Sequence, residues 1–121
     1  MIKEMKGWKV LKKCSRTSTT YSVYAIGYPT NVEVHPYIKG SKLFFFKDLR
    51  DANRFRLDTV GGMDYCIVVP CIAYNVTKPK WMCFFTSDYK QFWNSKNRSK
   101  LKTITFVVKG TFFAESIKCL A

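Results

Sequence analysis

Residues 43–55, LFFFKDLRDANRF, form the clearest local signal in the chain and decide the kind of fold that we predict. The apolar run LFFF that opens the stretch is typical of a strand buried on both faces. Asp48 follows it at a position that can cap a helix through residue 57. Leu49, Ala52 and Phe55 then recur at helical spacing on one face. The stretch therefore predicts a strand that leads directly into an amphipathic helix.

Further extended segments flank this unit, each rich in β-branched or aromatic residues and bounded by turn residues. The strands that we predict cover residues 6–13, 21–26, 32–34, 65–74, 81–85, 102–108 and 111–120. Pro70 interrupts one of them and indicates a bulge or an edge position, and residues 75–79 read as a loop. A short helix carrying Tyr89, Phe92 and Trp93 is also predicted.

The predicted fold is α+β, with a mostly antiparallel twisted sheet or a partly open small barrel covered by one main helix. A chain of 121 residues fits a single domain over residues 1–121, because two separate cores would each be too small to offset chain entropy. Hydrophobic residues make up 47% of the chain, which is enough to fill one core. No run approaches the ~18 apolar residues of a membrane span, so we expect no membrane association and a cytoplasmic protein.

Two stretches, residues 43–55 and the segment GTFFAESIKCL at 110–120, together support a resemblance. The chain resembles a group of small, largely uncharacterised proteins of phages and their hosts. Members carry a strand followed by an L-x-x-A-x-x-F helix and end in a G-T-x-x-A-[DE]-S-[VI] segment. The resemblance implies a virus-associated α+β domain in the host cell cytoplasm and supplies no activity; this chain is more basic than the group.

The charge balance is the most informative property for function. Lys and Arg number 21 and Asp and Glu number 8, a net charge of +13 at pH 7. An excess of this size steers polyanions towards a surface and holds them there. The alternative is that the lysines only keep the protein soluble.

Two blocks of the sequence contain cations and no acidic residue, namely residues 5–32 and 89–114. In the first, KGWKVLKK at 6–13 places Trp8 and Val10 on one face of a strand and Lys9 on the other, so we expect an exposed basic face. The second interleaves aromatic rings with cations, the mixture that grips phosphates and stacks bases. The ligand-binding residues that we predict are Lys9, Lys12, Lys13, Arg16, Trp93, Lys96, Arg98, Lys100 and Lys102. A third cluster of cations would extend this binding surface only if the fold brings it close to the other two. It consists of Lys39, Lys42, Arg50, Arg54 and Arg56.

The residues that catalysis needs are scarce, so we predict no catalytic residue and no enzyme. His35 is the single histidine and stands beside Pro36, as surface histidines often do. Glu115 is a slightly better candidate, but we favour its interpretation as an outward-facing strand residue paired with a lysine. The cysteines number five, with no C-x-x-C pair, which favours reduced, mostly buried thiols over a disulfide framework or a metal site. We predict no cofactor.

The function that the sequence favours is a virus-encoded basic binding protein that captures a nucleotide signal or nucleic acid, as a counter-defence factor acting by sequestration. The first alternative is an inhibitor that binds an acidic patch on a host defence enzyme. The second is a small transferase that uses Glu115. The sequence leaves open whether the protein forms a homo-oligomer.

Overall fold

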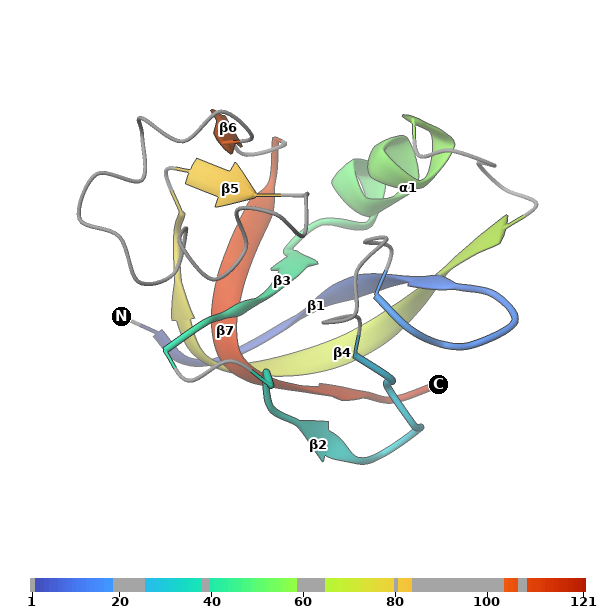
Figure 1. Cartoon of the computed structure of the whole chain (residues 1–121), viewed down its shortest axis with the longest axis horizontal. Coiled ribbons are helices and arrows are strands. Elements are labelled where there is room, and N and C mark those ends of the chain that lie inside the picture. The colour runs from blue at the N-terminus through green and yellow to red at the C-terminus, as the bar shows by residue number, and fades with distance from the viewer. Residues whose placement is uncertain are drawn as a thin grey trace.

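The computed structural model of the chain describes residues 2–18, 26–37, 40–58, 65–79, 81–83, 104–106 and 109–121 (Figure 1). The strands are β1 Ile2–Lys12, β2 Glu33–Val34, β3 Leu43–Phe46, β4 Cys66–Thr77, β5 Trp81–Cys83, β6 Ile104–Phe106 and β7 Thr111–Cys119, and the helix is α1 Leu49–Asp58. A five-stranded sheet has the order β2-β7-β3-β1-β4, and β5 and β6 form a separate pair. The pairings are antiparallel, which confirms a mostly antiparallel sheet with a helix and thus the α+β class.

The sheet contains one pairing beyond its linear order, because β7 pairs with both β3 and β4. Thr111–Ala114 of β7 lies opposite β3, and the stretch from Phe113 to Cys119 lies opposite β4. The pairings β7–β3, β3–β1, β1–β4 and β4–β7 therefore return to their starting strand. Figure 1 shows the strong curvature of β7 and β4 that makes this possible. One consequence is that β1 has protein on both of its faces.

The curved sheet requires a glycine at residue 7. A Cβ atom on Gly7 would lie 2.5 Å from the carbonyl oxygen of Phe46 and 2.6 Å from the Phe45 ring. β1 and β3 share the register pair Trp8↔Phe46, and their backbones meet closely there. Only a residue without a side chain allows this approach.

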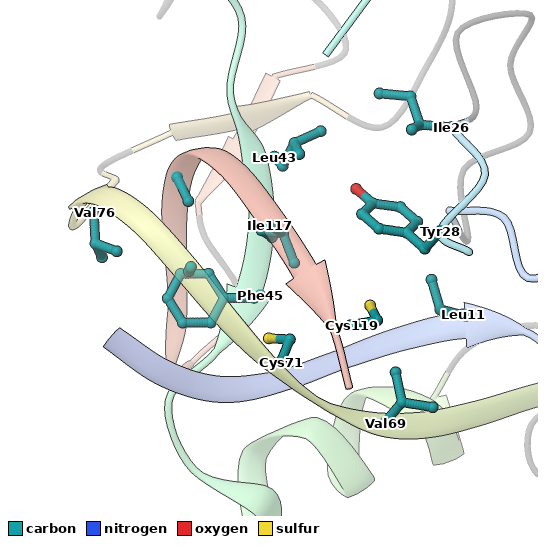
Figure 2. Packing of buried hydrophobic residues seen from close by; sticks show 12 residues of the cluster. Leu11, Ile26, Tyr28, Leu43, Phe45, Val69, Cys71, Val76, Ile117 and Cys119 are labelled. Carbon is teal, nitrogen blue, oxygen red and sulfur yellow. The ribbon is translucent and has the colours of Figure 1, made fainter. Parts of the chain in front are cut away.

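Buried residues form two clusters, one on each face of the sheet. The first lies inside the curve and is formed by Leu11, Ile26, Tyr28, Leu43, Phe45, Val69, Cys71, Ala73, Val76, Ala114, Ile117 and Cys119 (Figure 2). The second lies under α1 and is formed by Val10, Phe46, Ala52 and Cys66, with Trp8, Phe44, Phe55 and Val68 packed against it. The helix prediction is confirmed, with Ala52 fully buried and Phe55 against the sheet, but Leu49 is 43% exposed and is not part of the buried face.

The strand predictions are confirmed for most described segments. The edge strand predicted at 32–34 is β2, which pairs with β7 at one end of the strand order of the described sheet. The predicted strand at 21–26 and the short helix near Trp93 fall on residues outside the described ranges, except for Ile26. Among the described strands, β7 pairs with β2, β3 and β4, whereas β6 pairs with β5.

The prediction for residues 65–79 needs a correction. β4 runs without interruption from Cys66 to Thr77, through Pro70 and through the predicted loop. Pro70 lies next to the last β4–β7 pair, Cys71↔Cys119, and its carbonyl oxygen still accepts a hydrogen bond from the N–H of Leu120, so its missing N–H removes at most one bond at the end of this ladder. The irregular residue is Asn75, whose φ of 54° is left-handed, an arrangement that Asn tolerates better than most residues.

Candidate anion-binding surface

Lys9 is not on an exposed basic face, and that expectation is wrong. Its side chain is 1% exposed, because β1 is covered on its inner face by the curved sheet as well as on its outer face by α1. Its Nζ donates a hydrogen bond to the carbonyl oxygen of Phe44 at 2.6 Å. It also lies 3.8 Å from the centroid of the Phe44 ring and 5.1 Å from that of Tyr28. Lys9 therefore belongs to the core and cannot reach a ligand at the surface.

Burial lowers the pKa of the Lys9 ammonium from 10.5 to about 8, and the nearby Cys119 and Cys71 act in the opposite direction. The direction follows from desolvation, since an apolar core disfavours the charged form. The carbonyl and the aromatic ring of Phe44 together compensate part of that cost.

Arg16 is also engaged within the protein. Its Nε donates to the carbonyl oxygen of Tyr28 at 3.1 Å and its Nη2 to that of Ala121 at 2.8 Å. The backbone at Arg16 has a φ of 53°, in the turn that follows β1. These contacts tie the turn to the end of β7, so the guanidinium has a structural task besides any binding role.

Lys12 and Lys13 lie where β1 meets the start of β4. Lys12 is the ladder partner of Cys66 and is half-buried, and Lys13 is exposed. The backbone N–H of Lys13 donates to the carbonyl oxygen of Tyr65 at 2.6 Å. Both predicted residues are thus placed beside residues 65–66.

α1 brings Arg56 to the same place. Burial raises the pKa of the Cys66 thiol, while the positive charges of Arg56 and then Lys12 lower it. Arg56 directly follows Phe55, which packs against the buried cluster that contains Cys66, and Lys12 is the ladder partner of Cys66. The structure therefore joins two residues that are 44 positions apart in the sequence, 12 and 56.

An exposed aromatic ring completes this surface. Tyr65 is 65% exposed and directly precedes Cys66. We name the surface formed by Lys12, Lys13, Arg56 and Tyr65 the basic rim. Figure 1 shows α1, the turn after β1 and the start of β4 at the same end of the molecule. Cations beside an exposed ring can hold a phosphate while the ring stacks on a base.

Sequence reasoning found Lys12 and Lys13 and missed Tyr65. The sequence predicts Tyr65 only as the first residue of a strand. Its exposure depends on how the start of β4 packs under α1, which no local pattern shows. Of the third basic cluster, the fold places Arg56 at the basic rim and Arg50 and Arg54 on the exposed side of α1. Lys42 is paired elsewhere, and Lys39 lies outside the described residues.

The five predicted binding residues of the second block have no described placement. Trp93, Lys96, Arg98, Lys100 and Lys102 all lie outside the described ranges. Their role in binding stays a prediction.

Glu115 lies at the irregular point of β4 and β7. Its Oε1 accepts a hydrogen bond from Lys42 Nζ at 3.1 Å, and its Oε2 accepts one from Asn75 Nδ2 at 2.9 Å. These two hydrogen bonds, that from Lys42 first, lower the pKa of the Glu115 carboxyl. Glu115 is exposed, so the arrangement is the outward-facing strand residue paired with a lysine that the sequence suggested. At neutral pH it is an ionised carboxylate, which cannot act as a general acid.

The remaining candidates are dispersed. His35 Nε2 lies 3.2 Å from Glu33 Oε2, and both side chains are largely exposed. Among the described residues, no group of three or more His, Cys, Asp or Glu side chains is close enough to hold a metal ion. Cys14 is exposed, and Cys66, Cys71 and Cys119 are buried free thiols.

A mainly apolar hollow of about 270 Å³ lies at the opposite end of β1, lined by Ile2, Val76, Thr77, Lys78 and Phe112. It is separate from the basic rim, since Ile2 and Lys12 are the two ends of β1. In the described part of the chain, no helix has both the length and the apolar character needed to cross a membrane.

Comparisons with known proteins add no assignment to this geometry. Neither a protein-family model, nor a curated protein, nor a solved structure matches the chain.

Proposed function

We propose that the protein is a basic binding protein that captures a nucleotide or a nucleic acid at the basic rim. The observation that carries the proposal is that the exposed Tyr65 and the cations Lys12, Lys13 and Arg56 gather around the end of the β1–β4 pairing, Lys13 opposite Tyr65 and Lys12 and Arg56 near Cys66. Lys12 and Arg56 belong to β1 and α1, and Lys13 and Tyr65 adjoin the ends of β1 and β4. These elements pack together through a shared buried cluster, which supports the backbone of the rim as a binding site requires.

The chemistry of the rim suits a ligand that has both phosphate and base. Arginine forms paired hydrogen bonds with phosphate oxygens, and lysine supplies compact positive charge. Stacking of a base on an aromatic ring contributes about 1–3 kcal/mol in alanine-substitution experiments. The net charge of +13 would raise the local concentration of such a ligand before it docks.

The biological role that we propose follows from the resemblance to phage-associated proteins. The protein would be virus-encoded, would act in the host cell cytoplasm, and would counter a host defence by sequestering its nucleotide signal or nucleic acid. We further infer that the returning strand pairings form a small, partly open barrel covered by α1. We leave open a homo-oligomer in which two copies share a ligand.

Identification of the bound molecule tests the proposal. Protein purified from cells at low salt is denatured, and the released material is analysed by absorbance and mass spectrometry. We expect a nucleotide or nucleic acid with the unmodified protein and much less with the Tyr65→Ala, Arg56→Gln double variant. Tyr37→Ala, Lys47→Gln is the matched control, because it also removes one exposed ring and one positive charge and both residues lie outside the rim. Equal release from all three proteins would contradict the rim as the site.

The alternatives give different results in the same preparation. An inhibitor of a host defence enzyme would hold that enzyme through an acidic patch with no nucleotide present. A transferase would show turnover that Glu115→Gln abolishes, since its ionised carboxylate is the group available to orient a substrate hydroxyl. Loss of binding in the rim variants with full nucleotide content in Glu115→Gln favours the binding protein over both.

A further inference from the structure

Two cysteines lie directly opposite each other on neighbouring strands. Cys71 of β4 and Cys119 of β7 are ladder partners, the last pair at that end of the β4–β7 pairing. Just outside this pair, the backbone N–H of Leu120 donates to the carbonyl oxygen of Pro70 at 2.8 Å. In an antiparallel ladder this bond pattern marks a pair of the non-hydrogen-bonded kind, whose Cα atoms are about 4.5 Å apart. Side chains at such positions are closer than elsewhere in the ladder.

The two side chains occupy the same buried environment. Cys71 is 1% exposed and Cys119 is 0% exposed, and both belong to the inner cluster (Figure 2). Residues opposite each other in a ladder project to the same face of a sheet. Disulfides span Cα separations of roughly 4.4–6.8 Å, so this pair can be bridged without separating the strands.

We propose that Cys71 and Cys119 are an oxidation site, a thiol pair that closes to a cross-strand disulfide when the protein meets a low-molecular-weight disulfide. The Cys119 thiolate attacks one sulfur of the small disulfide and expels a small thiolate, which leaves a mixed disulfide. The Cys71 thiol then loses its proton, and its thiolate attacks the Cys119 sulfur and expels the second small thiolate. Two protein thiols are oxidised to one disulfide, and the small disulfide is reduced to two thiols.

The order of attack follows from the surroundings of each sulfur. Cys119 is the last residue of β7, and the end of a ladder opens more readily than its middle. Burial raises the pKa of both thiols, that of Cys71 to about 12, whereas Lys9 lowers both and Arg16 also lowers that of Cys119. Few thiolates exist at neutral pH, so the reaction is slower than at an exposed cysteine such as Cys14.

The disulfide would link β7 to β4 two residues before Ala121, whose carbonyl oxygen accepts a hydrogen bond from Arg16. A disulfide that closes the chain between residues 71 and 119 restricts the unfolded state and so stabilises the folded one. Oxidation is therefore expected to raise the thermal unfolding midpoint.

Peptide mapping tests the proposal directly. Folded Cys14→Ser protein, in which the exposed thiol of Cys14 is removed, is incubated with hydroxyethyl disulfide. It is then quenched with acid, alkylated in denaturant and digested without reduction. We expect a peptide pair linked through Cys71 and Cys119, an intact mass lower by the two hydrogens lost, and a raised unfolding midpoint that dithiothreitol reverses.

The matched control is Cys66→Ala in the same background. Cys66 is also buried in β4 but faces α1, so its removal should leave the link unchanged, whereas Cys71→Ala should abolish it. The map of the parent protein decides the matter even if a variant fails to fold. Links that join either cysteine to another partner, a link that forms only in denaturant, or free thiols at both positions after incubation beyond the global unfolding time would each overturn the proposal.

Discussion

Lys9 Nζ donates a hydrogen bond to the carbonyl oxygen of Phe44 at 2.6 Å and lies 3.8 Å from the centroid of the ring of the same residue. One residue of β3 thus meets a buried ammonium of β1 with both its backbone and its side chain. The pairing of β1 with β3 is short and contains the register pair Trp8↔Phe46. The Lys9–Phe44 contact therefore adds a further link between these two strands. A lysine in this core is a structural part of the sheet.

Replacing Lys9 should change how stability depends on pH. Burial lowers the pKa of Lys9 from 10.5 to about 8, so between these values the unfolded chain binds more protons than the folded one. Stability from this group is therefore lowest below pH 8 and rises through the window up to 10.5. We therefore compare the unfolding free energies of the unmodified protein and of Lys9→Met. The value for the unmodified protein minus that for Lys9→Met should rise through this pH window, by about 3 kcal/mol at most from the titration of Lys9.

Urea unfolding of both proteins below, within and above that window measures this difference. Burial raises the pKa values of the Cys71 and Cys119 thiols, which makes stability fall as the pH rises. Lys9 lowers both thiol pKa values, so this fall is larger in Lys9→Met and adds to the expected rise of the difference. A difference that stays constant with pH would show that Lys9 is not buried as a titrating group.

Lys42→Met should raise the pKa of the Glu115 carboxyl. The hydrogen bond from Lys42 is the main cause of the lowered value, and the bond from Asn75 would remain, so we expect a partial return towards 4.5. Stability from this group is present above pH 4.5 and is lost as the pH falls through the lowered value. Carboxyl chemical shifts followed by NMR give the midpoint, with Lys47→Met as the control. An unchanged midpoint in Lys42→Met would contradict the ion pair.

Gly7→Ala should destabilise the fold. The new Cβ would overlap the Phe46 carbonyl oxygen and the Phe45 ring, and overpacking of this kind costs about 1–3 kcal/mol. Gly27→Ala is the matched control, because a Cβ there meets nothing within 4 Å. Chemical denaturation of both variants measures the difference. Equal stability of the two variants would show that β1 and β3 do not approach each other as described.

Local parts of the fold could be predicted from the sequence, because local residues determine them. The apolar run at 43–46 and the helical spacing after Asp48 gave β3 and α1 with nearly correct ends. Alternation in residues 6–13 gave the strand β1 and set Lys9 on the face opposite Trp8 and Val10, but that face is buried and not exposed as expected. That error arose because the β4–β7 pairing, which closes protein over the inner face of β1, joins segments that no local pattern connects.

The candidate site could be predicted only in part, for the same reason. The run of charge in the sequence indicates Lys12 and Lys13 as binding residues. Their proposed role also depends on Arg56 and Tyr65, which helix packing and strand pairing bring to the same end of the sheet. Residues 75–79 were read as a loop because Asn and Pro favour turns, but pairing on both sides keeps Asn75 within β4.

The salt dependence of oligonucleotide binding tests the basic rim most directly. Affinity for a fluorescent single-stranded oligonucleotide is measured at several salt concentrations for the unmodified protein and for two triple variants. The rim variant carries Lys12→Gln, Lys13→Gln and Arg56→Gln, and the control variant carries Lys3→Gln, Lys47→Gln and Lys109→Gln. Both triple variants lose equal charge. We predict weaker binding and a slope of log affinity against log salt that is smaller by about 2 for the rim variant only. Equal loss in both variants, or no loss in either, would contradict the basic rim as the binding surface.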